Sequence, residues 1–155
     1  MAKKTGVGRT FAVNRRAHYD YDIEETFEAG LALTGSEVKS IREGRVNLRE
    51  GFVRPVDGEL YLWNVHISPW QPAGPFGHEP DRPRKLLLHK DEIAYIIGKL
   101  AQKGYTCVPL RLYEKDNRIK VEIGLGKGKK AYDKRRDEAE REAKRRIQEA
   151  LKRRF

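Results

Sequence analysis

Two runs of alternating apolar residues, separated by one polar turn, constrain the fold of this chain more than any other feature. They lie in "YTCVPLRLYEKDNRIKVEIGLG", residues 105–126, with the turn at Lys115 to Arg118. Side chains two residues apart point to the same face of a β-strand. The alternation therefore predicts an antiparallel hairpin with one apolar face, formed by Val108, Leu110 and Leu112 and then by Ile119, Val121, Ile123 and Leu125.

Two other segments supply strands. In residues 19–33 the large apolar residues fall on odd positions, which predicts a strand with one buried face: Tyr19, Tyr21, Ile23, Phe27, Leu31 and Leu33. Residues 51–67, "GFVRPVDGELYLWNVHI", predict a second hairpin, because Asp57-Gly58 is a favoured two-residue turn. Residues 69–83 carry five prolines, from which we expect a long surface loop without regular structure.

Two segments among these strands have apolar residues at helical spacing. In "TGSEVKSIREG" Ser36 is placed to cap a short helix, Val38 and Ile41 share one face, and Gly44 is placed to end it. In "RKLLLHKDEIAYIIGKLAQKG" Gly104 follows a run at positions i, i+3, i+4 and i+7, which predicts an amphipathic helix carried by Ile93, Ile96, Ile97 and Leu100.

These elements predict a mainly β fold. About six short antiparallel strands with hairpin connections, curled around one core, form a small antiparallel β-barrel with two to three helices. The oligonucleotide/oligosaccharide-binding (OB) fold is one such barrel. We expect a disordered N-terminus over residues 1–10, the barrel over residues 11–130, and a basic C-terminal tail over residues 131–155.

The charge balance points to a polyanionic partner. Lys and Arg total 33 against 23 Asp and Glu, a formal net charge of +10, which favours nucleic acid first and an anionic membrane second. No apolar run approaches the length of a membrane span, and "MAKKTGVGRTF" lacks the apolar core of a secretory signal. The single cysteine, Cys107, fits a reducing cytoplasm and lies in a strand pattern typical of a core residue.

Motifs for catalysis or metal binding are absent from the sequence. His18, His66, His78 and His89 do not have metal-ligand spacing, and there is no cysteine pair to assist them. Gly128-Lys129 does not complete a phosphate-binding loop, because Ile123 stands where that motif requires glycine. The acidic cluster Glu24, Glu25 and Glu28 reads first as solvated strand charge. We therefore expect no enzyme, no metal and no cofactor.

The C-terminal tail is helical in its spacing but has little to bury. Apolar residues recur every four positions, at Ala139, Ala143, Ile147, Leu151 and Phe155. Acid-before-base pairs four apart each contribute only about 0.2–0.5 kcal/mol, and an isolated helix of this length is marginal in water. We expect a tail that is largely disordered when free and helical in a negatively charged groove. The alternative is a charged terminus that is always solvated.

Four motifs in order resemble one protein family. They are "NRRAHYDYDIEETFEAGLALTGSEVKSIREGRVN", "RPRKLLLHKDEI", "GYTCVPLRLY" and "GKGKKAYDKRR". Over roughly residues 12–136 the chain closely resembles the SsrA-binding protein (small protein B) family. The resemblance implies a barrel related to the OB fold and a cytoplasmic, non-membrane partner of transfer-messenger RNA. It also implies trans-translation on stalled ribosomes, at the decoding centre of 16S rRNA. We expect a monomer.

The resemblance also assigns candidate RNA contacts. Asn14, Glu28 and Leu87 match family positions implicated in binding the tRNA-like domain. For Leu87 core packing is an equal alternative. Tyr19 or its neighbour His18 takes the place of a family histidine. The remaining candidates are basic: Lys39 and Arg42, three apart on a short helix, could face one phosphate strand or solvent, and the Gly/Lys stretch supplies Lys127, Lys129 and Lys130.

A second set of positions belongs to the ribosome. Asp133, Lys134 and Arg135 match the family's "DKR", associated with the decoding centre, and Tyr132 stands where the family often has histidine. An aromatic ring there could stack on an unpaired rRNA base. Ile147 and Leu151 would lie with the tail in the empty mRNA channel. The alternative function is a general ribosomal or ribosome-assembly protein that binds rRNA.

Overall fold

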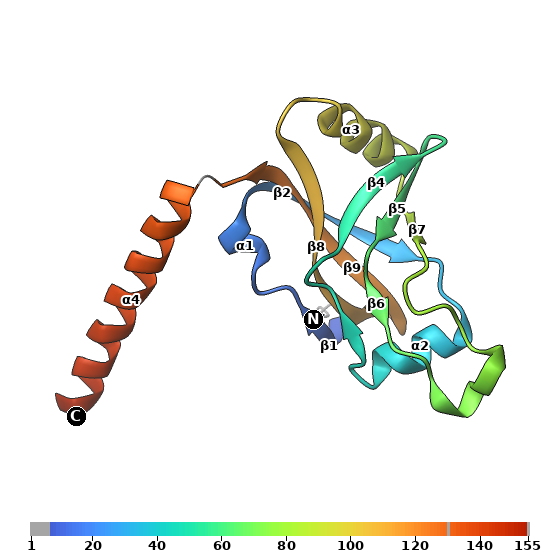
Figure 1. Ribbon diagram of the computed structural model, residues 1–155, viewed down its shortest axis with the longest axis horizontal. Coiled ribbons are helices and arrows are strands. Elements are labelled where there is room, and N and C mark those ends of the chain that lie inside the picture. The colour runs from blue at the N-terminus through green and yellow to red at the C-terminus, as the bar shows by residue number, and fades with distance from the viewer. Residues whose placement is uncertain (1–6, 130, 155) are drawn as a thin grey trace.

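The computed structural model describes residues 7–129 and 131–154, and its centre is one antiparallel sheet (Figure 1). Seven strands are hydrogen-bonded in the order β1-β8-β9-β2-β7-β5-β4. Their bounds are β1 Val7–Val13, β2 Tyr21–Leu31, β4 Phe52–Val56, β5 Glu59–Trp63, β7 Arg84–Leu87, β8 Tyr105–Lys115 and β9 Arg118–Gly128. A separate two-stranded ladder pairs β3 (Val46–Asn47) with β6 (His66–Ile67). The prediction of a mainly β, antiparallel fold is confirmed.

Both predicted hairpins are present, and the longer one is the spine of the sheet. β8 and β9 pair from Tyr105 opposite Lys127 to Lys115 opposite Arg118. Asp116 and Asn117 form the turn with φ of 53° and 64°, the left-handed values of a two-residue type I′ loop. In the β4–β5 hairpin Asp57 and Gly58 do the same, with φ of 50° and 79°.

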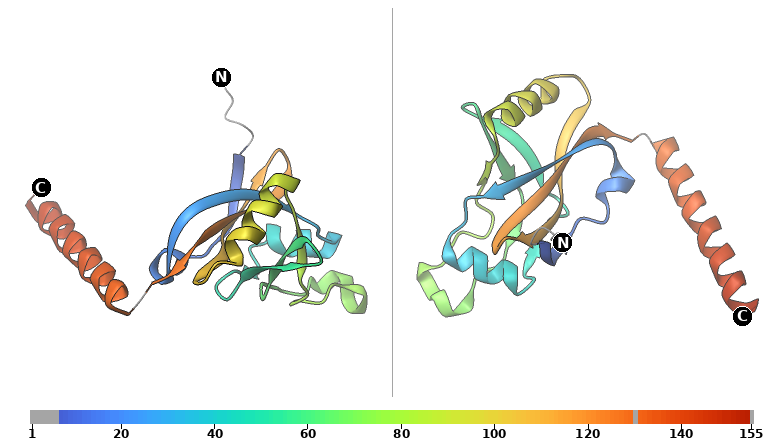
Figure 2. Two further views of the ribbon diagram at one scale, coloured as in Figure 1. Left: turned by 90° about the horizontal axis from the view of Figure 1, so that it is seen from above. Right: turned by 180° about the vertical axis from the view of Figure 1, so that it is seen from behind.

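The seven strands form a curled open sheet rather than the predicted closed barrel (Figure 2). In the described residues β1 pairs only with β8 and β4 only with β5. Beyond the end of β1, β4 lies beside β8 without a ladder. Pro109 lies in that part of β8, and proline has no N–H to donate to a neighbouring strand. Side-chain packing between β4 and β8 therefore stands in place of the hydrogen-bonded ladder that would have closed the barrel.

Four α-helices and one 3₁₀ turn surround the sheet: α1 Ala17–Asp20, α2 Gly35–Arg42, η1 Gln71–Phe76, α3 Lys90–Leu100 and α4 Ala131–Arg154. The two predicted helices in the body, α2 and α3, are confirmed. The cap of α2 is Thr34 rather than Ser36: the backbone N–H of Glu37 donates to the Thr34 hydroxyl and the Thr34 N–H donates to the Glu37 carboxylate, a capping box. The proline-rich segment is not wholly irregular, because it contains η1.

Strand β7 and its ion pairs connect the two halves of the sheet. β7 pairs with β2 on one side and β5 on the other, although no sequence pattern predicted a strand there. Arg84 on β7 is fully buried and donates from Nε to Glu37 of α2 at 2.8 Å. Arg82 donates to the other oxygen of the same carboxylate at 2.6 Å. Burial alone would raise the pKa of Glu37, but hydrogen bonds from Arg82, Thr34 and Arg84 hold it below its ordinary value. The ionised pair thus fixes α2 against the sheet.

Both ends of the chain differ from expectation. Residues 7–10, expected to be disordered, belong to β1, while residues 1–6 lie outside the described residues. The segment expected as a basic tail, disordered when free and helical when bound, is the helix α4, which stands away from the body in all views (Figures 1 and 2). Its alanines and its acid-before-base pairs, such as Glu142 with Arg146 at 3.1 Å, favour helix without burial.

Candidate nucleic-acid interface

The carboxylate of Glu28 is held in place on an exposed part of β2. It accepts a hydrogen bond from the Tyr113 hydroxyl and lies 3.2 Å and 3.4 Å from Nζ of Lys115, so two residues of β8 hold it from across β9. The hydrogen bonds from Tyr113 and Lys115 lower the pKa of Glu28 against the opposing effect of burial. An ionised acceptor is therefore held in a fixed position at the surface at neutral pH.

Leu87 lies beside Glu28 and is exposed. It sits on β7 opposite Gly30 of β2, two residues beyond Glu28, and 52% of its side chain is accessible. A Cβ at Gly30 would lie 3.3 Å from the Cβ of Leu87, so a side chain there would displace it. Glu28 and Leu87 line one hollow together with two cations, Lys85 and Lys120, and two further acids, Glu59 and Glu92. Of the two alternatives for Leu87, core packing is therefore wrong.

Asn14 is not part of this surface. It is buried, with 7% exposure, and its Nδ2 donates to the carbonyl oxygens of Pro109 at 3.0 Å and Leu48 at 3.4 Å. These bonds brace the chain between β1 and α1. The exposed residues at this bend are Arg15 and Arg16.

The two basic residues of α2 have different neighbours. Nζ of Lys39 lies 5.0 Å from the ring centroid of Trp70, at the start of the proline-rich loop. Arg42 lies 3.6 Å from the carboxylate of Glu114 on β8, and its guanidinium lies over Phe11. Lys39 and Arg42 therefore do not lie together where both could face one phosphate strand.

The root of α4 meets α1 around Tyr19, which lies in α1 and not in β2 as expected. The guanidinium groups of Arg16 and Arg141 lie over the Tyr19 ring, at 4.9 Å and 5.7 Å from its centroid. Its hydroxyl donates to Glu138 of α4. This hydrogen bond raises the pKa of Tyr19.

The Gly/Lys stretch before α4 is held against α1 and β2. Nζ of Lys129 donates to the carbonyl of His18 at 2.9 Å, and Nζ of Lys127 lies 5.0 Å from the Tyr105 ring centroid. A Cβ at Gly126 would lie 2.1 Å from the carbonyl oxygen of Asp22. Gly126 is therefore required by the close approach of β2, whereas Gly128 has open space around it. Lys130 lies outside the described residues.

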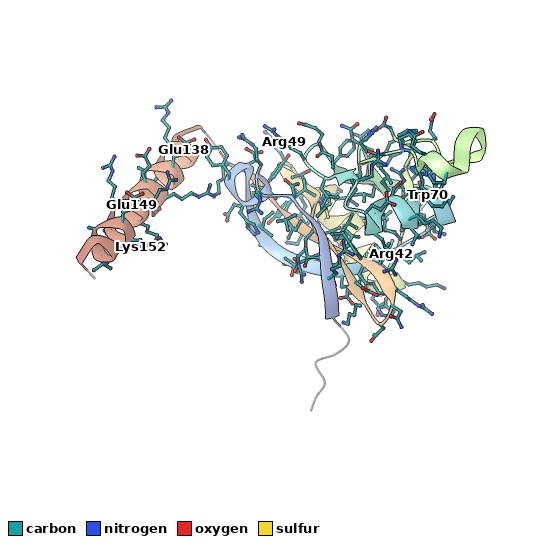
Figure 3. All side chains as sticks on the ribbon, turned by 90° about the horizontal axis from the view of Figure 1, so that it is seen from below. Arg42, Arg49, Trp70, Glu138, Glu149 and Lys152 are labelled. Atoms are coloured by element: carbon teal, nitrogen blue, oxygen red, sulfur yellow. The ribbon has the colours of Figure 1, made fainter. Side chains whose placement is uncertain are left out.

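Along α4 the described side chains are exposed, including Arg135. Ile147 and Leu151 are 60% and 48% accessible, and Glu149 and Lys152 project into solvent (Figure 3). The backbone of Tyr132, Asp133 and Lys134 is helical, and their side chains lie outside the description.

Several functional neighbours of Glu28 were missed from the sequence. Tyr113 and Lys115 hold its carboxylate, and Lys85 and Lys120 line the same hollow. The two-residue spacing of Tyr113 and Lys115 in the predicted hairpin was the one available signal, because it places both on the same face of β8.

Cys107 and the possible metal ligands are the candidates for chemistry in the residues that the structure describes. Burial raises the pKa of the Cys107 thiol to about 12, which makes it an inert core residue. Among residues 7–129 and 131–154, no group of three His, Cys, Asp or Glu side chains could hold a metal ion. In the same residues, no helix combines the length and apolarity needed to cross a membrane.

Comparison with known proteins gives matches along almost the whole chain. The family model described as SmpB protein matches residues 11–153. The SsrA-binding protein of Roseiflexus sp. (strain RS-1) is 61% identical over 155 residues, covering 99% of this chain and 98% of that protein. The SsrA-binding protein of Carboxydothermus hydrogenoformans is 56% identical over 147 residues, covering 95% of this chain and 99% of that protein.

A solved structure is also similar to this chain. It is described as "tmRNA-SmpB: a journey to the center of the bacterial ribosome". The matching chain in it has a TM-score of 0.66 and 49% identity, over 81% of this chain and 86% of that chain.

Proposed function

We infer that this chain, which belongs to the SmpB family, is a cytoplasmic RNA-binding adaptor of trans-translation. It binds the tRNA-like domain of transfer-messenger RNA and delivers that RNA to stalled ribosomes. It is not an enzyme. The support is the family match over residues 11–153, the full-length identity to SsrA-binding proteins and the likeness to a tmRNA–SmpB chain.

One observation carries the proposed RNA-binding surface: an ionised carboxylate and an exposed leucine share one hollow. A carboxylate facing RNA is repelled by phosphate, so Glu28 needs a specific donor, such as a 2′-hydroxyl or a base amine. Because Tyr113 and Lys115 already hold the carboxylate, little side-chain entropy is lost when it accepts that bond. Leu87 packs against a base face, and the cations Lys85 and Lys120 approach the phosphates.

Other sequence-predicted residues take supporting roles in this proposal. Asn14 acts through the backbone that it braces, which positions Arg15 and Arg16 for contact. Lys39 and Arg42 meet different phosphates, since they point apart. Tyr19, Lys127 and Lys129 lie at the basic and aromatic root of α4 and contact RNA there, and Lys130 follows them in the sequence as a further cation.

The tail function is the second part of the proposal. Tyr132, Asp133, Lys134 and Arg135 enter the decoding centre, and the rest of α4 lies in the empty mRNA channel. The exposure of Ile147 and Leu151 supports this, because two large apolar side chains remain available for a partner surface. We also propose that helix formation in free solution is incomplete and is completed in that channel.

We further propose that the curled sheet is a relative of the OB barrel. Its support is the position of β4 beside β8, where one more hydrogen-bonded pair would close the sheet. The alternative of a general ribosomal protein has no observation in its favour, since the full-length relatives described above are SsrA-binding proteins.

Binding to the isolated tRNA-like domain tests the surface. Glu28→Ala and Leu87→Asp should each weaken binding about tenfold, because each removes a contact that is not a simple charge pair. The slope of affinity against salt should stay nearly unchanged in both, whereas Lys39→Ala should reduce it by about one.

Glu24→Ala is the matched control, because Glu24 is an exposed acid on the same strand and also accepts a hydrogen bond from a tyrosine, Tyr105. It should bind as the parent does. Equal or tighter binding by Glu28→Ala would contradict the role of Glu28. Sequencing of the RNA that copurifies with the protein should return one RNA of transfer-messenger size rather than bulk rRNA.

A further inference from the structure

A second hollow adjoins the Glu28–Leu87 surface, between α2 and the turn of the β8–β9 hairpin. Its floor is apolar, formed by Leu31, Leu33 and Val38, all half-buried. Its rim carries Asn117 and Arg118 from the hairpin turn. Leu87 and Lys120 line both hollows, so the two are continuous.

The apolar floor is accessible because β2 has glycine next to it. Gly30 is also part of the lining, and the atoms nearest to the position of a Cβ on it belong to Leu87. An apolar floor edged by the cations Arg42, Arg118 and Lys120 has the chemistry that suits an unstacked base, whose face is apolar and whose phosphate is negative.

The rim groups are free to engage a ligand. Asn117 and Arg118 are exposed, and among the described residues neither side chain has a hydrogen bond or an ion pair within the protein. No acidic residue lines this hollow, whereas Arg42, Arg118 and Lys120 do. The carboxamide of Asn117 offers one acceptor and two donors, a set that can pair with the edge of any base.

We propose that this hollow, the base recess, holds one unpaired nucleobase of the RNA that lies on the Glu28–Leu87 surface. The base stacks on the apolar floor beside Leu87, Asn117 pairs with its edge, and Arg118 contacts the adjoining phosphate. Asn117 and Arg118 are thereby contact residues for an unpaired nucleotide of the RNA. The inference rests on the proposed function, because it needs RNA on the neighbouring surface.

The test uses a substitution that the fold accepts. Asn117 has φ of 64°, a left-handed value that glycine adopts readily, so Asn117→Gly removes the carboxamide and keeps the turn. Asp57→Gly is the control, because Asp57 is the first residue of the β4–β5 turn, also has a left-handed φ, of 50°, and lines neither hollow. Binding is measured with the full-length protein and a transcript of the tRNA-like domain, alone and with single abasic sites placed through its unpaired loops.

We expect Asn117→Gly to weaken binding about five- to tenfold and Asp57→Gly to leave it unchanged, with thermal midpoints that match the parent in both. One abasic position should weaken binding by the parent more than Asn117→Gly does, because it also removes the stacked base, and it should weaken binding by Asn117→Gly less than it weakens binding by the parent. Arg118→Ala should weaken binding and reduce the salt slope by about one.

Parental affinity in Asn117→Gly, or full additivity at every abasic position, overturns the base recess. If the Glu28→Ala and Leu87→Asp variants still lose affinity in that case, the RNA-binding surface stands and only the recess fails. If those two variants also bind normally, the proposed surface itself is wrong.

Discussion

Strand β9 and helix α4 are separated by a single short junction in the chain, yet they are stabilised in opposite ways. In β9 Val121, Ile123 and Leu125 are fully buried and every ladder bond goes to another strand. In α4 the described side chains are exposed and the backbone hydrogen bonds are internal to the helix. The body therefore keeps its shape only as a whole, whereas α4 can form, move or unfold without changing the body. A rigid surface suits recognition of a folded RNA, and a conditional helix suits a sensor of an empty channel.

Removal of α4 is expected to have the largest effect on function and almost none on the fold. A chain that stops before Asp133 loses no residue of the buried core, so its thermal midpoint and its affinity for the tRNA-like domain should match the parent. Peptide tagging on stalled ribosomes should fall to background. A reconstituted tagging assay, run beside a binding assay, measures both.

Two milder variants separate the possible causes of that loss. Proline at Ile147 and Leu151 disfavours the helix by about 3 kcal/mol per site and should remove most of the tagging. Aspartate at Lys134 and Arg135 should fail through repulsion from rRNA phosphate. Tagging that survives truncation would refute the channel role, and lost RNA binding would mean that α4 belongs to the RNA-binding surface.

A charge pair in the body should matter far more than a charge pair in α4. Arg84→Ala leaves the buried carboxylate of Glu37 without a main partner and should lower the free energy of unfolding by about 3–5 kcal/mol. Arg146→Ala removes an exposed i,i+4 pair with Glu142 and should cost under about 0.5 kcal/mol. Urea unfolding of the two variants measures the difference. Similar losses would show that α4 is coupled to the core.

The contrast between the two regions also explains how much of the fold could be predicted from the sequence. Strands with one buried face can be predicted because their apolar residues alternate with polar ones. The turns at Asp57-Gly58 and at Lys115–Arg118 locate both hairpins. β7 was missed because "RKLL" shows no alternation. The start of β2 was predicted too early in the chain. Tyr19 continues the odd-numbered pattern of apolar residues, although it lies in α1.

The candidate site was predictable only in part, because partners in space are not neighbours in sequence. Glu28 and Leu87 came from the family resemblance, and the structure brings them to one hollow. Asn14 could not be recognised as buried, since its partners are the backbone carbonyls of Leu48 and Pro109. The burial of Glu37 and Arg84 was equally hidden, because charged residues in a basic chain read as surface residues.

Protonation of Glu37 at low pH should lower the free energy of unfolding of the body. Protonation of any acidic residue in α4 should have a smaller effect. The folded pKa of Glu37 is below its ordinary value of 4.5, so the unfolded state binds the proton first. Its contribution is complete above about pH 5 and is lost as the pH falls through the folded pKa. Glu37→Gln, although less stable at pH 7, should show a shallower fall in stability between pH 5 and pH 3, by up to about 1.4 kcal/mol per pH unit.

Urea midpoints from pH 7 to pH 3 provide this measurement, and Glu142→Gln on α4 is the control. Its acid dependence should match the parent because its carboxylate is exposed. An unchanged acid slope in Glu37→Gln would show that another carboxylate governs the acid response.

The smallest expected effect is at the junction where the two regions touch. Tyr19→Phe removes the hydrogen bond from the α1 ring to Glu138 but keeps the ring contacts with Arg16 and Arg141. Because this contact is exposed, the stability of the body should not change. Amide hydrogen exchange in residues 135–142 of α4 should become about two- to threefold faster, while exchange in β8 and β9 stays the same. Tyr19→Ala, which also removes the ring, should give a larger increase in the same residues. Unchanged exchange in both variants would show that α4 is independent of the body even at its root. Slower folding, or faster exchange in β9, would show instead that the two regions form one cooperative unit.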